Sequence, residues 1–288
     1  MPQTINTNLI SLNAQRNLGS SQTSLATSMQ RLSSGMRVNS AKDDSAGLAI
    51  AERMNSQIRG MAVAVRNAND GISLTQTAEG ALGKVGDMLQ RMRELAVQAV
   101  NSTNSSGDRD SLNNEYLQLA SESTRTLSGT QFNGTTILAT ATDSVFQVGA
   151  NTTAALDQIS VAAFNWTNVG AITSAIGSNV GAANAPTIAV SGTDGLNATA
   201  AITALDAAIT AVNDQRAKFG AVQNRFDNVV ANLMVNVENQ TAARSRIMDA
   251  DYASETASLS RASILQQAGN AMVAQANQLP QQVLALLR

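Results

Sequence analysis

Both ends of this chain carry apolar residues at alternating three- and four-residue steps. This spacing places apolar side chains on one narrow stripe of a helix, the pattern with which coiled-coil helices contact each other. We therefore expect the N-terminal and C-terminal segments to be helices that pair. The seam residues that the pattern predicts are Leu25, Met29, Leu32, Met36, Leu265, Ala268, Met272 and Leu279.

Helical periodicity also fills most of the chain between its ends. Apolar residues spaced by three and four from residue 50 to 99 predict one helix that would be about 80 Å long. Ser40 and Asp43 have the spacing of a capping box and predict its start. The Ser- and Asn-rich stretch 101–107 predicts a turn into a shorter antiparallel helix that ends near Leu127. A further helix is expected from about residue 198 to 237.

The centre of the sequence has a different pattern. Asn133 and Gly134 lie beside β-branched residues and predict a tight β-hairpin, with 145–148 as another strand of the same small sheet. Between 151 and 199, alternating apolar residues favour short strands without a defined register. The candidate strand residues there are Ile159, Val161, Phe164, Trp166 and 188–190.

Together these patterns predict a mainly α fold. Its main feature is a long antiparallel helical hairpin, or coiled-coil bundle, formed by both termini. A small β-hairpin region and a short outer insert complete it. Aromatic residues make up 3% of the chain, so side chains large enough to fill a globular core are scarce and helix-to-helix packing by Ala, Leu, Val and Met is favoured.

Composition excludes several classes of function. The net charge of −2, without blocks of like charge, gives no reason to expect nucleic acid or an anionic membrane as a partner. The chain has no Cys and no His, which removes thiolate nucleophiles, imidazole bases and the usual zinc ligands. The carboxylate pairs Asp43 with Asp44 and Asp249 with Asp251 are expected at helix starts. We expect no catalytic, cofactor or metal site.

The last part of the sequence is uncharged between Arg261 and Arg288. Asn and Gln recur almost every helical turn and Pro280 interrupts the stretch, so it does not have the pattern of a membrane span. Uncharged helices suit burial among other helices, because a charge would be costly to desolvate there. The first residues lack a Sec-type signal, so export would need another route.

Several stretches resemble bacterial flagellins. They are LSSGMRVNSAKDDSAGLAIA at 32–51, QRMRELAVQ at 90–98, TQFNGTTIL at 130–138, TAARSRIMDADYASE at 241–255 and SILQQAGNAMVAQANQLPQQVLALLR at 263–288. The resemblance covers about the first 150 and the last 90 residues, in the family's order, and leaves the insert without a counterpart.

The resemblance implies a subunit that polymerises into the helical flagellar filament for swimming motility. It would leave the cell unfolded through the flagellar type III system and be extracellular. Its expected partners are further copies of itself, an export chaperone, and the filament cap and hook-filament junction proteins. The implied segments are an N-terminal core helix at 1–41 paired with 255–288, a helical spoke with the β-hairpin at 42–150, a variable outer insert at 151–199, a returning spoke at 200–254 and the C-terminal core helix at 255–288.

The family's contacts with host innate immune receptors can be placed on matching residues. A contact with a Toll-like receptor falls on Arg91, Leu95 and Glu115. The competing interpretation is ordinary helix packing, with Arg91 paired to Asp87 and Leu95 in a seam. The segment read by cytosolic inflammasome receptors falls on the C-terminal residues Val283, Leu284, Leu286 and Leu287, which also have seam spacing.

Three alternatives to a filament subunit remain open on the sequence alone. A hook-filament junction protein would share the termini, although not the full signatures at 249–255 and 266–272. A secreted amphipathic pore former would use its ends on membranes, but such helices usually carry more Lys and Arg. An enzyme confined to the insert would have only scattered Asp as a base.

Overall fold

The structure is a computed structural model that describes residues 7–177, 190–192 and 196–286. It divides into two compact units, which we describe separately. The terminal unit comprises Met1–Ile58 and Glu238–Arg288, and the central unit comprises Arg59–Val237. Two long helices, α2 (Ser45–Val100) and α6 (Leu196–Met248), contribute residues to both.

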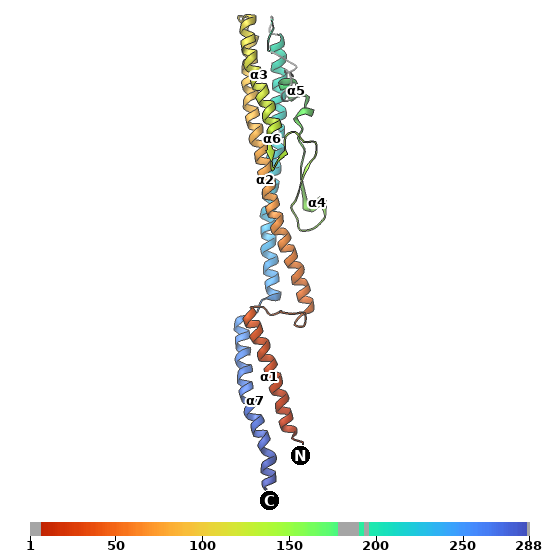
Figure 1. The fold of residues 1–288 in the computed structure, drawn as a ribbon, viewed down its shortest axis with the longest axis vertical. Coiled ribbons are helices and arrows are strands. Elements are labelled where there is room, and N and C mark those ends of the chain that lie inside the picture. Colours follow the sequence, from red (N-terminus) through yellow and green to blue (C-terminus); the bar gives the residue numbers. More distant parts are fainter. Residues whose placement is uncertain (1–6, 178–189, 193–195, 287–288) are drawn as a thin grey trace. The chain divides into compact units, whose positions relative to one another are not determined.

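The terminal unit is built on two antiparallel helices, α1 (Leu9–Ser34) and α7 (Tyr252–Leu286). At one end of the pair Asn8 Nδ2 donates to the carbonyl of Ala276 at 2.7 Å. Towards the other end Arg31 forms an ion pair with Glu255 at 3.1 Å. Segments more than 200 residues apart thus lie side by side (Figure 1). The prediction that the two ends of the chain pair as helices is confirmed.

The start of α2 differs from the prediction. The amide and the hydroxyl of Ser40 both donate to the carboxylate of Asp43, which closes a turn and keeps the pKa of Asp43 below its usual value, chiefly through the hydroxyl. Neither residue caps a helix. The cap is Asp44, whose carboxylate accepts the amide of Gly47 at 2.8 Å. The predicted capping box at Ser40 is therefore wrong, because its two members satisfy each other.

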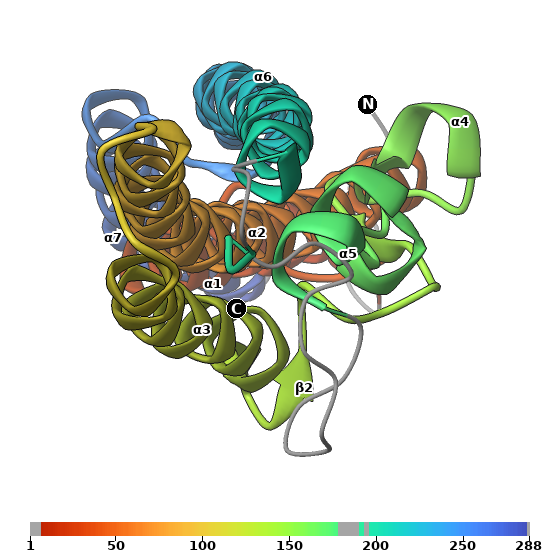
Figure 2. The same cartoon turned by 90° about the horizontal axis from the view of Figure 1, so that it is seen from above.

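The central unit is a layer of three helices. Within it α2 lies between α3 (Ser106–Gly129) and α6, as Figure 2 shows. The core between them is continuous and formed by apolar residues at helical spacing. Fully buried side chains come from each helix, including Leu82, Leu89, Met92, Tyr116 and Leu205. Burial raises the pKa of Tyr116 to about 12, and its hydroxyl donates to the carbonyl of Ala175.

Two small sheets lie beside these helices. The first is β1 (Gln131–Phe132) with β2 (Thr135–Thr136), joined by Asn133 at φ 49° and Gly134 at φ 78°. Positive φ at both central residues is the conformation of a type I′ hairpin turn, so this hairpin prediction is confirmed. The second sheet is β3 (Ser144–Gln147) with β4 (Gln158–Val161).

The strand at 145–148 therefore does not join the first sheet as predicted. Its partner is β4, which carries the predicted strand residues Ile159 and Val161, and the connection between them holds the short helix α4 (Ala154–Asp157). Phe164 and Trp166 do not form strands. Trp166 begins a 3-10 helix, η1 (Trp166–Asn168), which precedes α5 (Gly170–Ile176). Of the candidate strand 188–190, residues 188 and 189 lie outside the described residues.

The N-terminus of α3 has a complete capping box. The amide of Asp108 donates to the Ser105 hydroxyl at 3.2 Å, and the Asp108 carboxylate accepts the amide and the hydroxyl of Ser105. The two bonds from Ser105 hold the pKa of Asp108 below its usual value, and the bond from the amide has the larger effect. A carboxyl with a lowered pKa stabilises the fold above the ordinary carboxyl range and loses this effect as pH falls through the lowered pKa.

We expect Ser105→Ala to lower the free energy of unfolding by about 1 kcal/mol. In this variant the free energy of unfolding should also fall less as the pH is lowered into the acidic range, because Asp108 loses the hydroxyl that lowers its pKa. Urea unfolding followed by circular dichroism at neutral and acidic pH measures both effects. The control is Ser111→Ala in the same helix, whose hydroxyl donates only to the carbonyl of Gly107 one turn before it. Equal losses from the two variants would contradict the capping role.

Candidate assembly surface

The seam between α1 and α7 is built largely from small residues. On α1 the less exposed positions repeat by three and four, and the small side chains Ser11, Ala14, Ser21 and Ser28 alternate with leucines. On α7 the corresponding positions are Ala262, Gln266, Gly269, Val273 and Ala276. A Cβ added to Gly269 would come within 3.1 Å of Leu18 Cδ1, so the two helices approach closely here. The sequence interpretation missed this stripe of Ser, Ala and Gly, although its spacing was visible.

The predicted seam residues fall into two groups in the structure. Leu25 and Leu32 lie on the half-buried side of α1, and Met36 lies just beyond the end of that helix. Met29, Leu265, Ala268 and Met272 are exposed on the pair. Leu279 belongs to α7, but its side chain is outside the described residues. The pair of helices thus leaves several large apolar side chains without cover.

The outer faces of the pair combine apolar and uncharged polar residues. Leu9 is 69% exposed, Ile264 66% and Met272 61%. In the two helices the charged residues are Arg16, Arg31, Glu255 and Arg261, and two of these four pair with each other. A surface with so few charges can be covered by another protein without a large desolvation penalty.

The end of α1 and the start of α7 are tied together by backbone hydrogen bonds. Gly35 ends α1 at φ +70°, a conformation that favours glycine, and its carbonyl accepts the amide of Ala250 at 2.9 Å. The amide of Arg37 donates to the carbonyl of Met248 at 2.6 Å. Met36 and Asp249 form the antiparallel bridge between these bonds. We call the segments 35–44 and 249–251 the joint.

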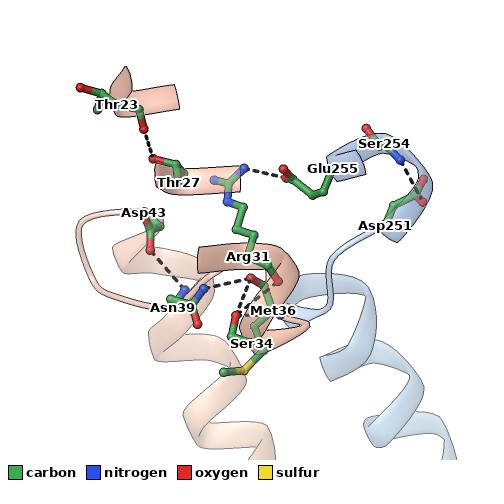
Figure 3. A network of polar contacts seen from close by, with 10 residues as sticks. All are labelled: Thr23, Thr27, Arg31, Ser34, Met36, Asn39, Asp43, Asp251, Ser254 and Glu255. Atoms are coloured by element: carbon green, nitrogen blue, oxygen red, sulfur yellow. Dashed lines mark hydrogen bonds and ion pairs between the residues drawn. The ribbon is translucent and has the colours of Figure 1, made fainter. Parts of the chain in front are cut away.

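Side chains complete the joint (Figure 3). The Asn39 amide group donates to the carbonyl of Met36, and Arg31 reaches across to Glu255. Asp251 begins α7 by accepting the amides of Ala253 and Ser254, as the sequence predicted for a helix start. The carboxylate of Asp249 accepts the hydroxyl of Ser245 instead. Both carboxylates therefore have structural partners.

The predicted receptor residues lie on neighbouring helices of the central unit. Arg91 on α2 forms ion pairs at 2.9 Å with Glu115 on α3 and with Glu94. Hydrogen bonds to these two carboxylates raise the pKa of Arg91, and the bond to Glu94 has the larger effect. Asp87 pairs with Lys84. Leu95 is only 1% exposed and belongs to the helical core. Arg91 and Glu115 thus form one exposed patch, whereas the Leu95 side chain lies beneath the surface.

The C-terminal residues are described only in part. Val283, Leu284 and Leu286 belong to the last turns of α7, but their side chains lie outside the described residues, as does the whole of Leu287. Within the described part of the chain, no helix is long and apolar enough to cross a membrane. Among those same residues, the acidic side chains nowhere gather in a group of three or more that could hold a metal ion.

Comparison with known proteins identifies the same regions. The family profile described as the bacterial flagellin N-terminal helical region matches residues 5–143, and that of the flagellin C-terminal helical region matches 202–287. A flagellin of Halalkalibacterium halodurans is 46% identical over 285 residues, covering 99% of both chains. A flagellin of Bacillus subtilis is 44% identical over 313 residues and is likewise covered to 99%. The crystal structure of Bacillus cereus flagellin is 34% identical, covers 62% of this chain and 94% of its own, and gives a TM-score of 0.48.

Proposed function

The chain belongs to the bacterial flagellin family and is a structural subunit of the flagellar filament, and from this we propose that the α1–α7 pair is its main assembly surface. The observation that carries the proposal is the row of exposed apolar residues on two nearly uncharged helices. Copies of the same pair offer the cover that these residues lack. The predicted seam residues that are exposed on one pair, such as Met29 and Met272, then become buried between copies.

This proposal predicts that a charge on the outer face stops filament growth. Ile264 is 66% exposed in the single chain, so Ile264→Asp should leave the monomer folded. Between copies the new carboxylate would be buried without a partner. We expect the lowest protein concentration that supports growth to rise at least about a hundredfold. Sedimentation and electron microscopy after seeding with filament fragments measure this concentration.

The matched control is Ile264→Asn, which is similar in size to aspartate but uncharged. Its effect should be much smaller, because an amide finds partners more cheaply than a buried carboxylate. Circular dichroism should show the same helical content for both variants and the unmodified chain. If Ile264→Asp supports growth at the unmodified concentration, the outer face of α7 is not an assembly surface.

Export and its partners form a second part of the proposal. The same apolar helices would be a liability before assembly, because exposed apolar surface promotes unwanted association. We propose that an export chaperone covers the C-terminal helix and that the chain passes unfolded through the flagellar type III system. Addition at the filament end would then involve the cap and hook-filament junction proteins.

We also propose that host innate immune receptors bind this chain. The candidate Toll-like receptor contact is the exposed pair Arg91 and Glu115, supported from below by Leu95. The C-terminal residues Val283, Leu284, Leu286 and Leu287 are the candidate contact for cytosolic inflammasome receptors. Both proposals rest on the family resemblance of these stretches, and the Toll-like receptor proposal rests also on the exposure of the charged pair.

The receptor proposal predicts a large loss of signalling in a double variant. Arg91→Ala with Glu115→Ala removes the exposed charges and keeps Leu95, whose replacement would also disturb the core. We expect the concentration of soluble protein for half-maximal signalling to rise at least about tenfold, since charged pairs at the centre of interfaces cost this much or more. The control is Arg125→Ala with Glu122→Ala, another exposed ion pair, on α3. Similar dose curves for both double variants would contradict the assignment.

A further inference from the structure

A cavity of about 460 Å³ lies in the central unit beside α6. The segment 163–169 contributes Phe164 and Val169 together with Asn165 and Asn168. Helix α6 contributes Ala211 together with Asp214, Gln215 and Lys218. The two charged residues have opposite sign, so the cavity as a whole attracts neither anions nor cations strongly. Its size and mixed lining suit a small apolar side chain together with a stretch of peptide backbone.

Gln215 is the buried polar residue of this cavity. The residue is 5% exposed, and its Nε2 has no hydrogen-bond partner. Buried N–H groups in native proteins are almost always paired with protein or water, so this amide group can donate to an acceptor that enters the cavity. A backbone carbonyl, the commonest acceptor in proteins, would suit this position.

The most exposed large apolar side chain among the described residues also belongs to the central unit. Leu156 is 82% exposed and lies on α4, in the connection between β3 and β4. The connection, residues 148–157, contains a single charged residue, Asp157, which is 9% exposed. A leucine presented on a turn whose one charged side chain is nearly buried is suited to insertion into a partly apolar hollow.

Leu156 cannot reach the cavity of its own chain. The β3–β4 ladder has four residue pairs, from Ser144 with Val161 to Gln147 with Gln158. The lining residues at 140–141, 163–165 and 168–169 continue from the first of these pairs, whereas α4 follows the last. The ladder alone separates the two features by about 10 Å. Figure 1 shows α4 at the end of the hairpin that is remote from α5.

We propose that Leu156 of one copy inserts into the cavity of the next copy along the filament. A carbonyl of the incoming turn accepts the hydrogen bond from Gln215 Nε2, and the leucine side chain covers Phe164 and Ala211. Leu156 and the cavity lie on different surfaces of the same molecule, so the contact between copies is heterologous. Such a contact can repeat without closing, as a filament requires. This inference rests on the filament function and names one contact within it.

The absence of cysteine makes a direct test possible, because introduced cysteines are the only thiols. The double variant Leu156→Cys with Ala211→Cys is assembled under reducing conditions, and its filaments are checked by electron microscopy. Mild oxidation, denaturation and non-reducing electrophoresis follow. We expect a ladder of cross-linked multimers, because each copy carries both halves of the contact. Each single variant should give no ladder.

The control double variant is Val145→Cys with Ala211→Cys. Val145 is also exposed on the hairpin, but it lies on β3 and away from the turn, so oxidation should produce no ladder. Filaments of the first double variant that give no ladder would overturn the proposed contact and leave the filament function intact. If that variant grows no filaments, the two single variants are assembled together with unmodified chain. Cross-linked dimers then support the contact, and their absence overturns it.

A milder substitution gives an independent measurement. Leu156→Ser should raise the lowest concentration for filament growth about tenfold, because each added copy loses the burial of one leucine side chain. Val145→Ser is the matched control and should change it little. An equal effect of the two substitutions would show that Leu156 makes no specific contact with the next copy.

Discussion

Replacing Gly269 by leucine is expected to separate α1 from α7 and to abolish filament growth. A Cβ at this position already comes within 3.1 Å of Leu18 Cδ1 and 3.7 Å of Leu18 Cβ. A leucine side chain would therefore have to push the helices apart at a point where they already approach closely. Because the pair makes few polar contacts to hold it, the loss of close contact at one point should propagate along both helices.

Gly269→Ala separates this steric effect from the effect of helix propensity. Alanine needs a shift of only a few tenths of an ångström from the flexible end of Leu18, and it stabilises an isolated helix by about 1 kcal/mol relative to glycine. We expect Gly269→Ala filaments to grow and Gly269→Leu filaments not to grow at any tested concentration. Seeded growth followed by light scattering measures both variants. Normal growth of the leucine variant would show that α1 and α7 do not stay paired in the filament.

The long helices could be predicted because their signal is local and repeated. From residue 50 to 99 the apolar positions follow the helical period, and the structure places them in one uninterrupted helix. The pairing of the chain ends also followed from two matching patterns. The detailed seam did not follow, because side chains of any size can occupy a seam. Here Ser28, Ala262 and Gly269 allow close approach, and larger residues such as Met29 remain outside.

The predictions that failed depend on distant partners. The strand at 144–147 could pair with 135–136 or with 158–161, and both choices satisfied the alternation of apolar residues. In the structure its partner is β4, and Ile159 and Val161 of β4 are buried. The capping box predicted at Ser40 and Asp43 was wrong for a different reason. These two side chains can form hydrogen bonds with each other or with the first amides of a helix. Local sequence alone does not decide between these arrangements.

Phe226 should be the most sensitive apolar residue of the central unit. It is fully buried on α6, and its ring meets the ring of Phe146 on β3 edge to face, with centroids 5.6 Å apart. Gly71 on α2 provides the space for it, because a Cβ there would lie 2.6 Å from Phe226 Cζ. One ring thus joins α2, α6 and the β3–β4 sheet.

Phe226→Ala should lower the free energy of unfolding by about 3 to 5 kcal/mol, because it removes buried apolar area and leaves a cavity. For a unit of this size that corresponds to a fall in the melting temperature of about 10 °C or more. The measurement is thermal and urea unfolding of the soluble chain, followed by circular dichroism. Met234→Ala, an exposed position two turns further along α6, is the control and should change stability by less than about 0.5 kcal/mol. If both variants lose the same stability, the ring does not join the three elements as the structure shows. If only Phe226→Ala loses it, the buried ring stabilises the central unit as its contacts with Gly71 and Phe146 indicate.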